Sequence, residues 1–195
     1  MSSGTGAARL ERSYFEDLYD RDPDPWGFAS SEYERDKYAH TLAALGGRRF
    51  EKALDVGCSI GVFTEQLAWR CRDVLALDVS GQAVAAASQR LRRRPWVRVE
   101  RRTLPEDMPI GPFDLIVCSE VLYYWSEPLL AEGLDALSAA LRPGGLLLAV
   151  HFTDRTRTYP LQGHRVHELV RSHPDLTPIH GEDRSRYRLD LLERA

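Results

Sequence analysis

Three acidic residues and two glycines have the types and the spacing to hold a small ligand and act on it. Asp55, Gly57 and Gly61 lie at the end of a short apolar run, in the pattern acidic-x-Gly-x-x-x-Gly. Asp78 stands 21 residues after Gly57, at the end of the next apolar run, and Glu120 follows a later one. Glycine permits a positive φ and a close approach of the backbone to a ligand. A carboxylate beside such a loop repels a pyrophosphate but suits a ligand that carries an ammonium group.

The same loop excludes two common nucleotide-binding motifs. The dinucleotide fingerprint needs glycines where this chain has Ser59 and Val62, and the Gly-Lys-Ser/Thr of a phosphate loop does not follow. S-adenosylmethionine (SAM) presents an ammonium, a sulfonium and one carboxylate, and Asp78 is placed to accept hydrogen bonds from both of its ribose hydroxyls. The loop and this acid therefore predict a SAM site. The alternative interpretation is a tight turn plus a surface aspartate.

Apolar patterning alternates between short strands and longer helices. The expected strands are 53–56, 74–78, 96–101, 113–119 and 146–152, with two less clear ones at 178–181 and 187–192. The expected helices are 82–93, 127–141 and 166–171, with one more after Gly61 that has Phe63, Leu67 and Cys71 on one face. This alternation predicts a single α/β domain with a doubly wound, mostly parallel, Rossmann-like sheet. Ligands of such sheets bind beyond the carboxyl ends of the strands, where the strand order switches.

Three regions are predicted along the chain. Residues 1–9 are small and polar and are expected to form a disordered tail. Residues 10–47 should form two helices: one over 10–20, and one that begins near Ser31, where Ser31 and Glu34 form a capping-box pattern. Residues 48–195 should form the α/β core.

The charge balance gives no global attraction to nucleic acid. The net charge is −3, from 26 basic and 29 acidic residues among 195. One local exception is a group of seven arginines within residues 90–102. The end of a solvated helix and an exposed strand face explain this group, and an anion or RNA patch is the alternative.

No apolar run approaches the roughly 20 residues of a membrane helix, and the first twelve residues lack the apolar core of a signal peptide. We therefore expect a cytoplasmic protein. Cys58, Cys71 and Cys118 are an odd number at scattered positions. They are expected to be small buried thiols rather than disulfides or metal ligands.

Residues 50–152 resemble a class I SAM-dependent methyltransferase. The resemblance rests on the glycine loop, on Asp78, on the strand Phe113-Asp114-Leu115-Ile116-Val117 and on the turn Leu141-Arg142-Pro143-Gly144-Gly145. Much of that superfamily has an acid near the end of the third strand that contacts the adenine amino group. Here Thr103 and Leu104 occupy that region, so Thr103 or a backbone group is expected to take that role.

A narrower resemblance, to the nodulation protein S family, covers most of the chain. It rests on Asp24-Pro25-Trp26, Tyr33-Glu34-x-x-Lys37-Tyr38, Val56-Gly57-Cys58-x-x-Gly61-Val62-Phe63-Thr64 and Ser119-Glu120-Val121-Leu122-Tyr123-Tyr124. That family N-methylates an amino sugar at the end of a chito-oligosaccharide. The resemblance implies that the N-terminal helices cover the cofactor and acceptor sites. Trp26 and Lys37 would then hold SAM, with Lys37 near its carboxylate. A core tryptophan and a surface lysine are the alternatives.

The expected cofactor is SAM, with S-adenosylhomocysteine (SAH) as product and no metal. The candidate cofactor-binding residues are Trp26, Lys37, Asp55, Gly57, Cys58, Gly61, Asp78, Val79, Thr103, Leu104 and Ser119. His164 and His167 are three residues apart on an expected helix, but two histidines without a third ligand do not predict a metal site.

The candidate catalytic residues are Glu120, Tyr123 and His151. An amine acceptor must lose a proton to react, so a nearby carboxylate, tyrosine or histidine can accept or orient that proton. Glu120 is the first candidate, and a structural acid is its alternative. Tyr123 and Tyr124 either line the acceptor pocket or only pack, and His151 either faces the same cleft or is structural.

The predicted function is SAM-dependent methylation of a small molecule, namely N-methylation of an amino sugar or a related amine. O-methylation of a small metabolite is an alternative, as is a non-catalytic or RNA-binding module with the same fold. The sequence around Glu120 differs from the Asn/Asp-Pro-Pro-Tyr motif of enzymes that methylate base amino groups. Nucleic acid is therefore not the favoured partner, and the sequence does not indicate an oligomeric state.

Overall fold

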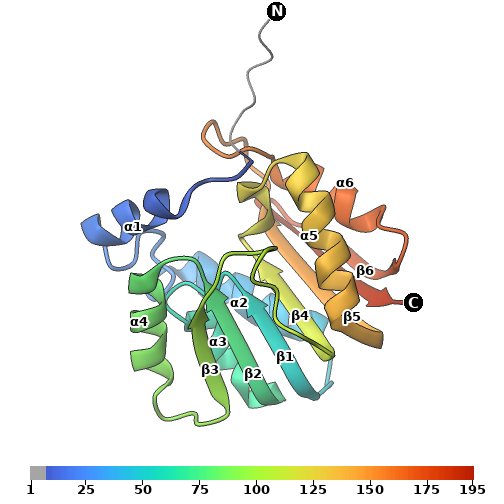
Figure 1. The fold of residues 1–195 in the computed structure, drawn as a ribbon, viewed down its shortest axis with the longest axis horizontal. Helices are drawn as coiled ribbons and strands as arrows, with labels where there is room; N and C mark the ends of the chain where they lie inside the picture. Colours follow the sequence, from blue (N-terminus) through green and yellow to red (C-terminus); the bar gives the residue numbers. More distant parts are fainter. Residues whose placement is uncertain (1–7) are drawn as a thin grey trace, which may run out of the picture.

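The computed structural model describes residues 8–195, which form an α/β domain (Figure 1). Its helices are α1 (Arg12–Arg21), α2 (Glu32–Ala44), α3 (Val62–Leu67), α4 (Gly81–Leu91), α5 (Glu127–Ala140) and α6 (Gly163–Arg171). Its strands are β1 (Phe50–Val56), β2 (Cys71–Asp78), β3 (Val97–Arg101), β4 (Phe113–Ser119), β5 (Leu141–Phe152), β6 (Leu176–Asp183) and β7 (Tyr187–Arg194). Short 3₁₀ turns lie at Ala68–Arg70 and Leu122–Tyr124.

The seven strands form one sheet in the order β3-β2-β1-β4-β5-β7-β6. The first five strands are parallel, and β7 pairs antiparallel with both β5 and β6. The chain moves outward from β1 through β2 to β3, and then returns to place β4 on the other side of β1. The predicted doubly wound, mostly parallel sheet is confirmed, and its strand order switches between β1 and β4.

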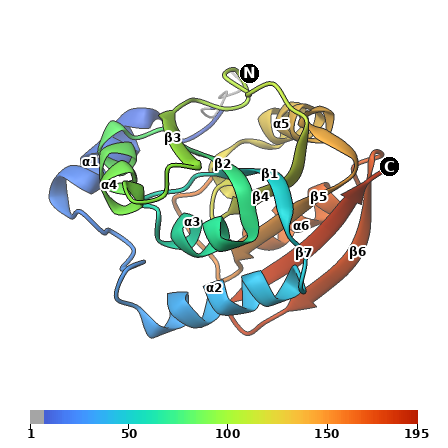
Figure 2. The ribbon, with the colours of Figure 1, turned by 90° about the horizontal axis from the view of Figure 1, so that it is seen from below.

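Helices cover both faces of the sheet (Figure 2). Side chains alternate between the faces along each strand. Leu75 and Leu77 of β2 therefore join the core under α5 and α6, whereas Val74 and Ala76 join the clusters on the other face. That second face carries α2, α3 and α4. Because both faces are buried, the central strands are continuous apolar runs, as the sequence predicted.

Most expected elements are present, with two differences. The helix after Gly61 is shorter than expected, because a 3₁₀ turn follows Leu67 and Cys71 is the half-buried first residue of β2. The helix near Ser31 begins as predicted: the Ser31 side chain accepts a hydrogen bond from the backbone N–H of Glu34. The second difference concerns the expected disordered tail over residues 1–9. Its residues 1–7 lie outside the described part, but its last two residues are described.

Within that expected tail, Ala8 and Arg9 are ordered. Arg9 forms a β-bridge with Trp125, and the carbonyl of Ala8 accepts a hydrogen bond from the N–H of Ser126 at 2.7 Å. Backbone pairing thus holds this segment against the start of α5. Among the described residues, no helix combines the length and apolar character required to cross a membrane.

A buried carboxylate joins β1 to α3. Asp55 is 2% exposed, and its Oδ2 accepts a hydrogen bond from Oγ1 of Thr64 at 2.6 Å. Burial raises the pKa of Asp55 to about 6, although the Thr64 hydroxyl opposes this shift. The folded state therefore binds the Asp55 proton more tightly than the unfolded chain does. Stability is lost as the pH rises toward 6 and Asp55 ionises, and Thr64 offsets part of that loss.

We expect Thr64→Val to lower the free energy of unfolding at pH 7.5 by about 1.5–3 kcal/mol, the range for a lost hydrogen bond to a charged group. The loss should be smaller at pH 5, where Asp55 is protonated in the folded state. Urea denaturation at both pH values measures it, with Thr64→Ser, which keeps the hydroxyl, as the control. An equal loss at the two pH values would contradict this account.

Candidate functional site

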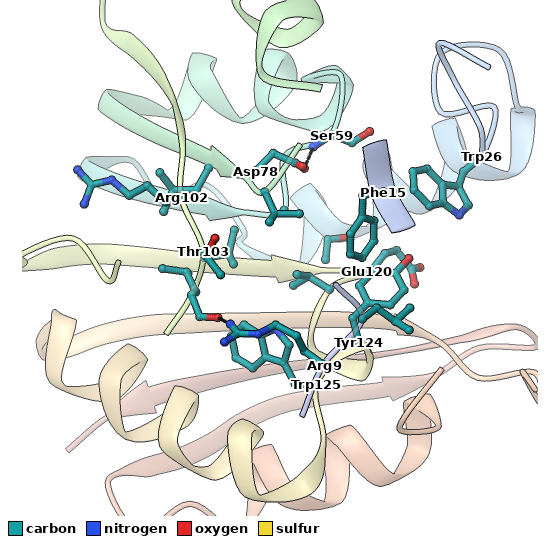
Figure 3. A pocket seen from close by; sticks show the side chains of 18 of the residues that line it. Arg9, Phe15, Trp26, Ser59, Asp78, Arg102, Thr103, Glu120, Tyr124 and Trp125 are labelled. Atoms are coloured by element: carbon teal, nitrogen blue, oxygen red, sulfur yellow. Dashed lines mark hydrogen bonds between the residues drawn. The ribbon is translucent and has the colours of Figure 1, made fainter. Parts of the chain in front are cut away.

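A pocket lies at the carboxyl ends of β1, β2 and β4, where the strand order switches (Figure 3). It encloses about 780 Å³, part of which is open to solvent. The predicted site residues that line it are Trp26, Gly57, Asp78, Val79, Thr103, Leu104, Ser119 and Glu120. The predicted site residues that do not line it are Lys37, Asp55, Cys58, Gly61, Tyr123 and His151.

The two glycines of the loop have different roles. Gly57 lines the pocket with φ +75°, and a Cβ there would lie 3.0 Å from the Val121 side chain, which is also part of the wall. Gly61 has φ +79°, and a Cβ there would lie 3.1 Å from Ala87 of α4. Cys58 packs in the same cluster as Ala87. In this structure Gly61 and Cys58 pack the loop onto α4, and their contacts with a ligand stay a prediction.

Asp78 ends β2 with its carboxylate in the pocket wall. Its Oδ2 accepts the backbone N–H of Ser59 at 2.8 Å (Figure 3), and its Oδ1 accepts that of Ser80 at 2.9 Å. Burial raises the pKa of Asp78 to about 6, and the two backbone N–H groups oppose the shift. Each oxygen can accept a second hydrogen bond. Asp78 thus presents two acceptor positions to the pocket, whereas Asp55 is buried on Thr64 and presents none.

Glu120 directly follows β4 and has φ 56°, a left-handed conformation that non-glycine residues seldom adopt. Its backbone N–H donates to the carbonyl of Val150 at 2.8 Å. Its Oε2 accepts the hydroxyl of Tyr123 at 2.5 Å and the backbone N–H of Phe152 at 2.9 Å. Lys37 donates to Oε1 at 2.6 Å. Glu120 therefore lines the pocket from a left-handed turn at the end of β4.

Lys37 and Tyr123 contact Glu120 from outside the pocket. Lys37 is 2% exposed and also donates to Oε1 of Glu34 at 3.0 Å. Burial alone lowers the pKa of Lys37, but the charges of Glu120 and Glu34 outweigh burial and raise it. In this structure the Lys37 ammonium lies between two carboxylates of the protein, and its contact with a cofactor carboxylate stays a prediction.

The Tyr123 ring stacks on Tyr159, with centroids 4.8 Å apart, and its hydroxyl is committed to Glu120. Burial, followed by the charge of Glu120, raises the pKa of Tyr123 well above its ordinary value. Tyr123 is thus a neutral hydrogen-bond donor that acts through Glu120.

His151 does not reach the pocket. It is fully buried, and its Nε2 accepts the backbone N–H of Leu122 at 3.2 Å. Its Nδ1 lies 3.2 Å from Nε2 of His167, whose Nδ1 lies 2.7 Å from Oδ2 of Asp190. Burial and the neighbouring charges of His167 and Lys37 lower the pKa of His151 well below its ordinary value. His151 is therefore a neutral residue outside the pocket, which favours its structural alternative, and a catalytic role for it stays a prediction.

An aromatic wall lines one side of the pocket, and of its residues the sequence indicated only Trp26 and, as one of two alternatives, Tyr124. Phe15 and Tyr19 of α1 line it, and so do Phe28, Tyr124 and Trp125. Trp26 and Phe28 stack with centroids 5.5 Å apart. A detectable signal existed, since Phe15 and Tyr19 are four residues apart and share one helical face. α1 and the loop after it therefore supply the cover that the family resemblance implied for the N-terminal helices, whereas α2 packs mainly on the sheet.

Arg9 was also missed, and it lines the pocket beside Trp125, with which it forms a β-bridge. Its guanidinium donates to the carbonyl of Leu104 at 2.7 Å and pairs with Glu106. The backbone N–H of Thr103 donates to Oδ2 of Asp107 at 3.0 Å, and the Thr103 carbonyl accepts the N–H of Asp107. Backbone groups of Thr103 are therefore occupied, and only its hydroxyl is left to face a ligand.

Four of the seven arginines within residues 90–102 form ion pairs with acids. Ion pairs join Arg90 and Arg94 to Glu65, Arg98 to Asp73, and Arg102 to Glu100. Within residues 8–195, no cluster of three or more metal-ligating side chains is found.

The sequence matches the family described as nodulation protein S (NodS) over residues 12–155. Nodulation protein S of Azorhizobium caulinodans is 31% identical over 145 residues, which cover 71% of this chain and 69% of the relative. The crystal structure of N-methyltransferase NodS from Bradyrhizobium japonicum WM9 in complex with SAH superimposes with a TM-score of 0.84 at 25% identity. That alignment covers 94% of this chain and 97% of the other.

A ubiquinone biosynthesis O-methyltransferase of Methylococcus capsulatus is 33% identical over 111 residues, which cover 55% of this chain and 44% of the relative. Across four curated nodulation proteins, the alignments span 49% to 69% of the relative's length. The family match covers most of this chain and includes the glycine loop, Asp78 and Glu120. The chain therefore belongs to the nodulation protein S family of methyltransferases.

Proposed function

We propose that this protein transfers a methyl group from SAM to an amine of a small molecule, with amino sugars as the first acceptor class to test. One observation carries the proposal. The Glu120 carboxylate, held in a left-handed turn at the end of β4, faces the same pocket as Asp78 and Gly57. Family membership supports the reaction class, and the geometry of Glu120 supports an amine acceptor.

The residues that line the pocket fit SAM. The two free acceptor positions of Asp78 match the two vicinal hydroxyls of a ribose. Val79 and Leu104 provide apolar contact for an adenine beside the Thr103 hydroxyl. Gly57 leaves the backbone open at the position where Val121 would clash with a side chain. We assign these residues to the cofactor, together with Ser119 and Trp26, which line the same space.

The acceptor position of Glu120 favours an N–H group. Its Oε2 already accepts two hydrogen bonds, whereas Oε1 accepts only that of Lys37 and keeps one lone pair. An amine offers an N–H to that lone pair while its own lone pair points elsewhere. A hydroxyl acceptor needs a stronger base, and no histidine lines the pocket among the described residues.

Positioning is the main contribution of the chain in this mechanism. When bound, SAM supplies a sulfonium methyl that an amine lone pair can displace, which leaves SAH. The aromatic wall excludes water and orients the acceptor, and Glu120 accepts the N–H and then the proton that the amine must lose. Alignment of the two reactants lowers the barrier more than any acid or base does here.

We expect Asp78→Ala to weaken SAM binding about ten- to a hundredfold, since hydrogen bonds to a charged group contribute about 1.5–3 kcal/mol. Isothermal titration calorimetry with SAM and SAH measures it. Asp78→Asn, which keeps one carbonyl oxygen, should lose less. Unchanged affinity in Asp78→Ala would remove Asp78 from the cofactor site.

We expect Glu120→Gln to lower kcat on an amine acceptor about 10²–10⁴-fold, the range for acid–base assistance. SAM affinity should remain that of the wild type, because Glu120 is not assigned to the cofactor. Glu132→Gln, at an exposed position of α5, is the matched charge control. Full activity of Glu120→Gln would contradict the role of Glu120.

The acceptor panel separates the candidate functions. Wild-type protein is assayed with radiolabelled SAM on glucosamine oligomers that carry a free amine, on their N-acetylated forms, on phenolic hydroxyl compounds and on RNA. Transfer to the free amines alone supports the proposal. Transfer only to hydroxyl compounds or only to RNA would replace it.

A further inference from the structure

The most unusual electrostatic feature of the site is a lysine buried between two glutamates. Lys37 Nζ lies 2.6 Å from Oε1 of Glu120 and 2.9 Å from Oε2 of Glu34. The Lys37 side chain is 2% exposed, and those of Glu34 and Glu120 are 10% and 11% exposed. Lys37 Nζ also lies 5.3 Å from the ring centroid of Tyr33. The ammonium therefore has protein partners on each side, and one of them is the carboxylate that faces the pocket.

Lys37 determines which lone pair of Glu120 remains for a ligand. Tyr123 and Phe152 occupy both acceptor positions of Oε2, and Lys37 occupies one of the two on Oε1. The remaining acceptor position is thus on the oxygen that Lys37 holds. If Lys37 were absent, Glu120 could rotate about its side-chain bonds, and its free lone pair would no longer have one direction.

Lys37 also determines the charge of the pair. Glu34 and Glu120 without a cation between them would be two carboxylates in one buried space, and such pairs take up a proton. Burial raises the pKa of Glu34 even in the presence of Lys37, whose charge opposes the shift. A protonated Glu120 would donate a hydrogen bond rather than accept one, so it could not receive an amine proton.

Other titratable groups surround this cluster on every side. The tyrosines are Tyr33, Tyr38, Tyr123 and Tyr187, which are neutral because burial raises their pKa values. The remaining groups are His151, His167 and Arg186. His151 and His167 are neutral in their hydrogen-bond chain, and Arg186 lies over the Tyr33 ring and pairs with Asp154. Lys37 is thus the cation in direct contact with Glu34 and Glu120.

We propose that Lys37 and Glu34 are positioning residues for the acceptor: Lys37 keeps Glu120 a carboxylate with its free lone pair aimed at the acceptor amine, and Glu34 balances and orients Lys37. The proposal rests on the proposed function for the identity of the acceptor. It assigns Lys37 to the acceptor side of the site rather than to the cofactor. It also means that α2, which packs mainly on the sheet, contributes two residues that position the Glu120 carboxylate.

The test compares Lys37→Met, which removes the charge and keeps the chain length, with the double variant Lys37→Met/Glu34→Gln. Lys37→Met should lower kcat on the amine acceptor about 10- to 100-fold and leave SAM affinity unchanged. This loss of kcat should be larger at pH 6 than at pH 9, because Glu34 and Glu120 share a proton at the lower pH. The double variant should recover about tenfold in rate relative to Lys37→Met, because Glu120 then no longer shares the buried space with a second carboxylate.

This recovery separates a positioning role from a merely structural one, for which the double variant would be no better than the single. The proposal is overturned if Lys37→Met loses SAM affinity with an unchanged pH profile, since Lys37 would then hold the cofactor. It is also overturned if the rate does not recover in the double variant. Glu32→Gln, exposed on the same helix and paired only with Arg35, is the control.

A second measurement needs no acceptor and so stands apart from the proposed function. In protein with ¹³C-labelled glutamate carboxyl groups, NMR titration should show a carboxyl that gains a proton near neutral pH in Lys37→Met but not in the wild type or in the double variant. Resonances are assigned with Glu34→Gln and Glu120→Gln. If Lys37→Met does not fold, Glu34→Gln is compared with the double variant. The double variant should then be about tenfold slower at equal SAM affinity, and equal rates would overturn the proposal.

Discussion

The reversal of strand order between β1 and β4 is the constraint on which the rest of this site depends. The connection that follows β1 moves the chain toward β2 and β3, whereas β4 lies on the other side of β1. Two neighbouring parallel strands therefore end side by side while their connections diverge, which leaves a crevice at their carboxyl ends. Gly57 after β1 and Glu120 after β4 border that crevice, and Asp78 after β2 completes the adjacent wall. A glycine loop and two acids far apart in the chain thereby face one space.

The N-terminal region supplies the other half of the site, and its parts do different things. α1 and the loop after it bring aromatic rings to the crevice, and Arg9 donates a hydrogen bond to the carbonyl of Leu104 in the pocket wall. α2 lies against the sheet, yet Lys37 extends from it to the Glu120 carboxylate. Because this region crosses both the open edge of the crevice and one face of the sheet, it contributes to the pocket wall and to the electrostatics behind it.

Behind the pocket, two neutral histidines and a buried aspartate form a hydrogen-bond chain that holds the turn that carries Glu120 and Tyr123. The backbone N–H of Leu122 donates to His151, which is joined through His167 to Asp190. Because Nε2 of His151 accepts that hydrogen bond, its Nδ1 carries the proton that it donates to His167. Asp190, whose pKa is lowered to about 2 despite its burial, also accepts from Arg171 and Arg188. These histidines hold the backbone of that turn.

The sequence by itself determined the strands and helices of the core, the glycine loop and the presence of acids at strand ends, because periodic apolar patterns and turn residues report local burial and local geometry. It did not determine which polar side chains meet. Asp55 and Asp78 both end apolar runs, but only the fold shows that Asp55 points to Thr64 and Asp78 to the pocket. Lys37 and Glu120 are 83 residues apart, and His151 lies in an apolar strand whose alternation does not reveal its partner. Contacts between distant segments arise only when the elements pack, so the tertiary structure alone decided which residues form the site.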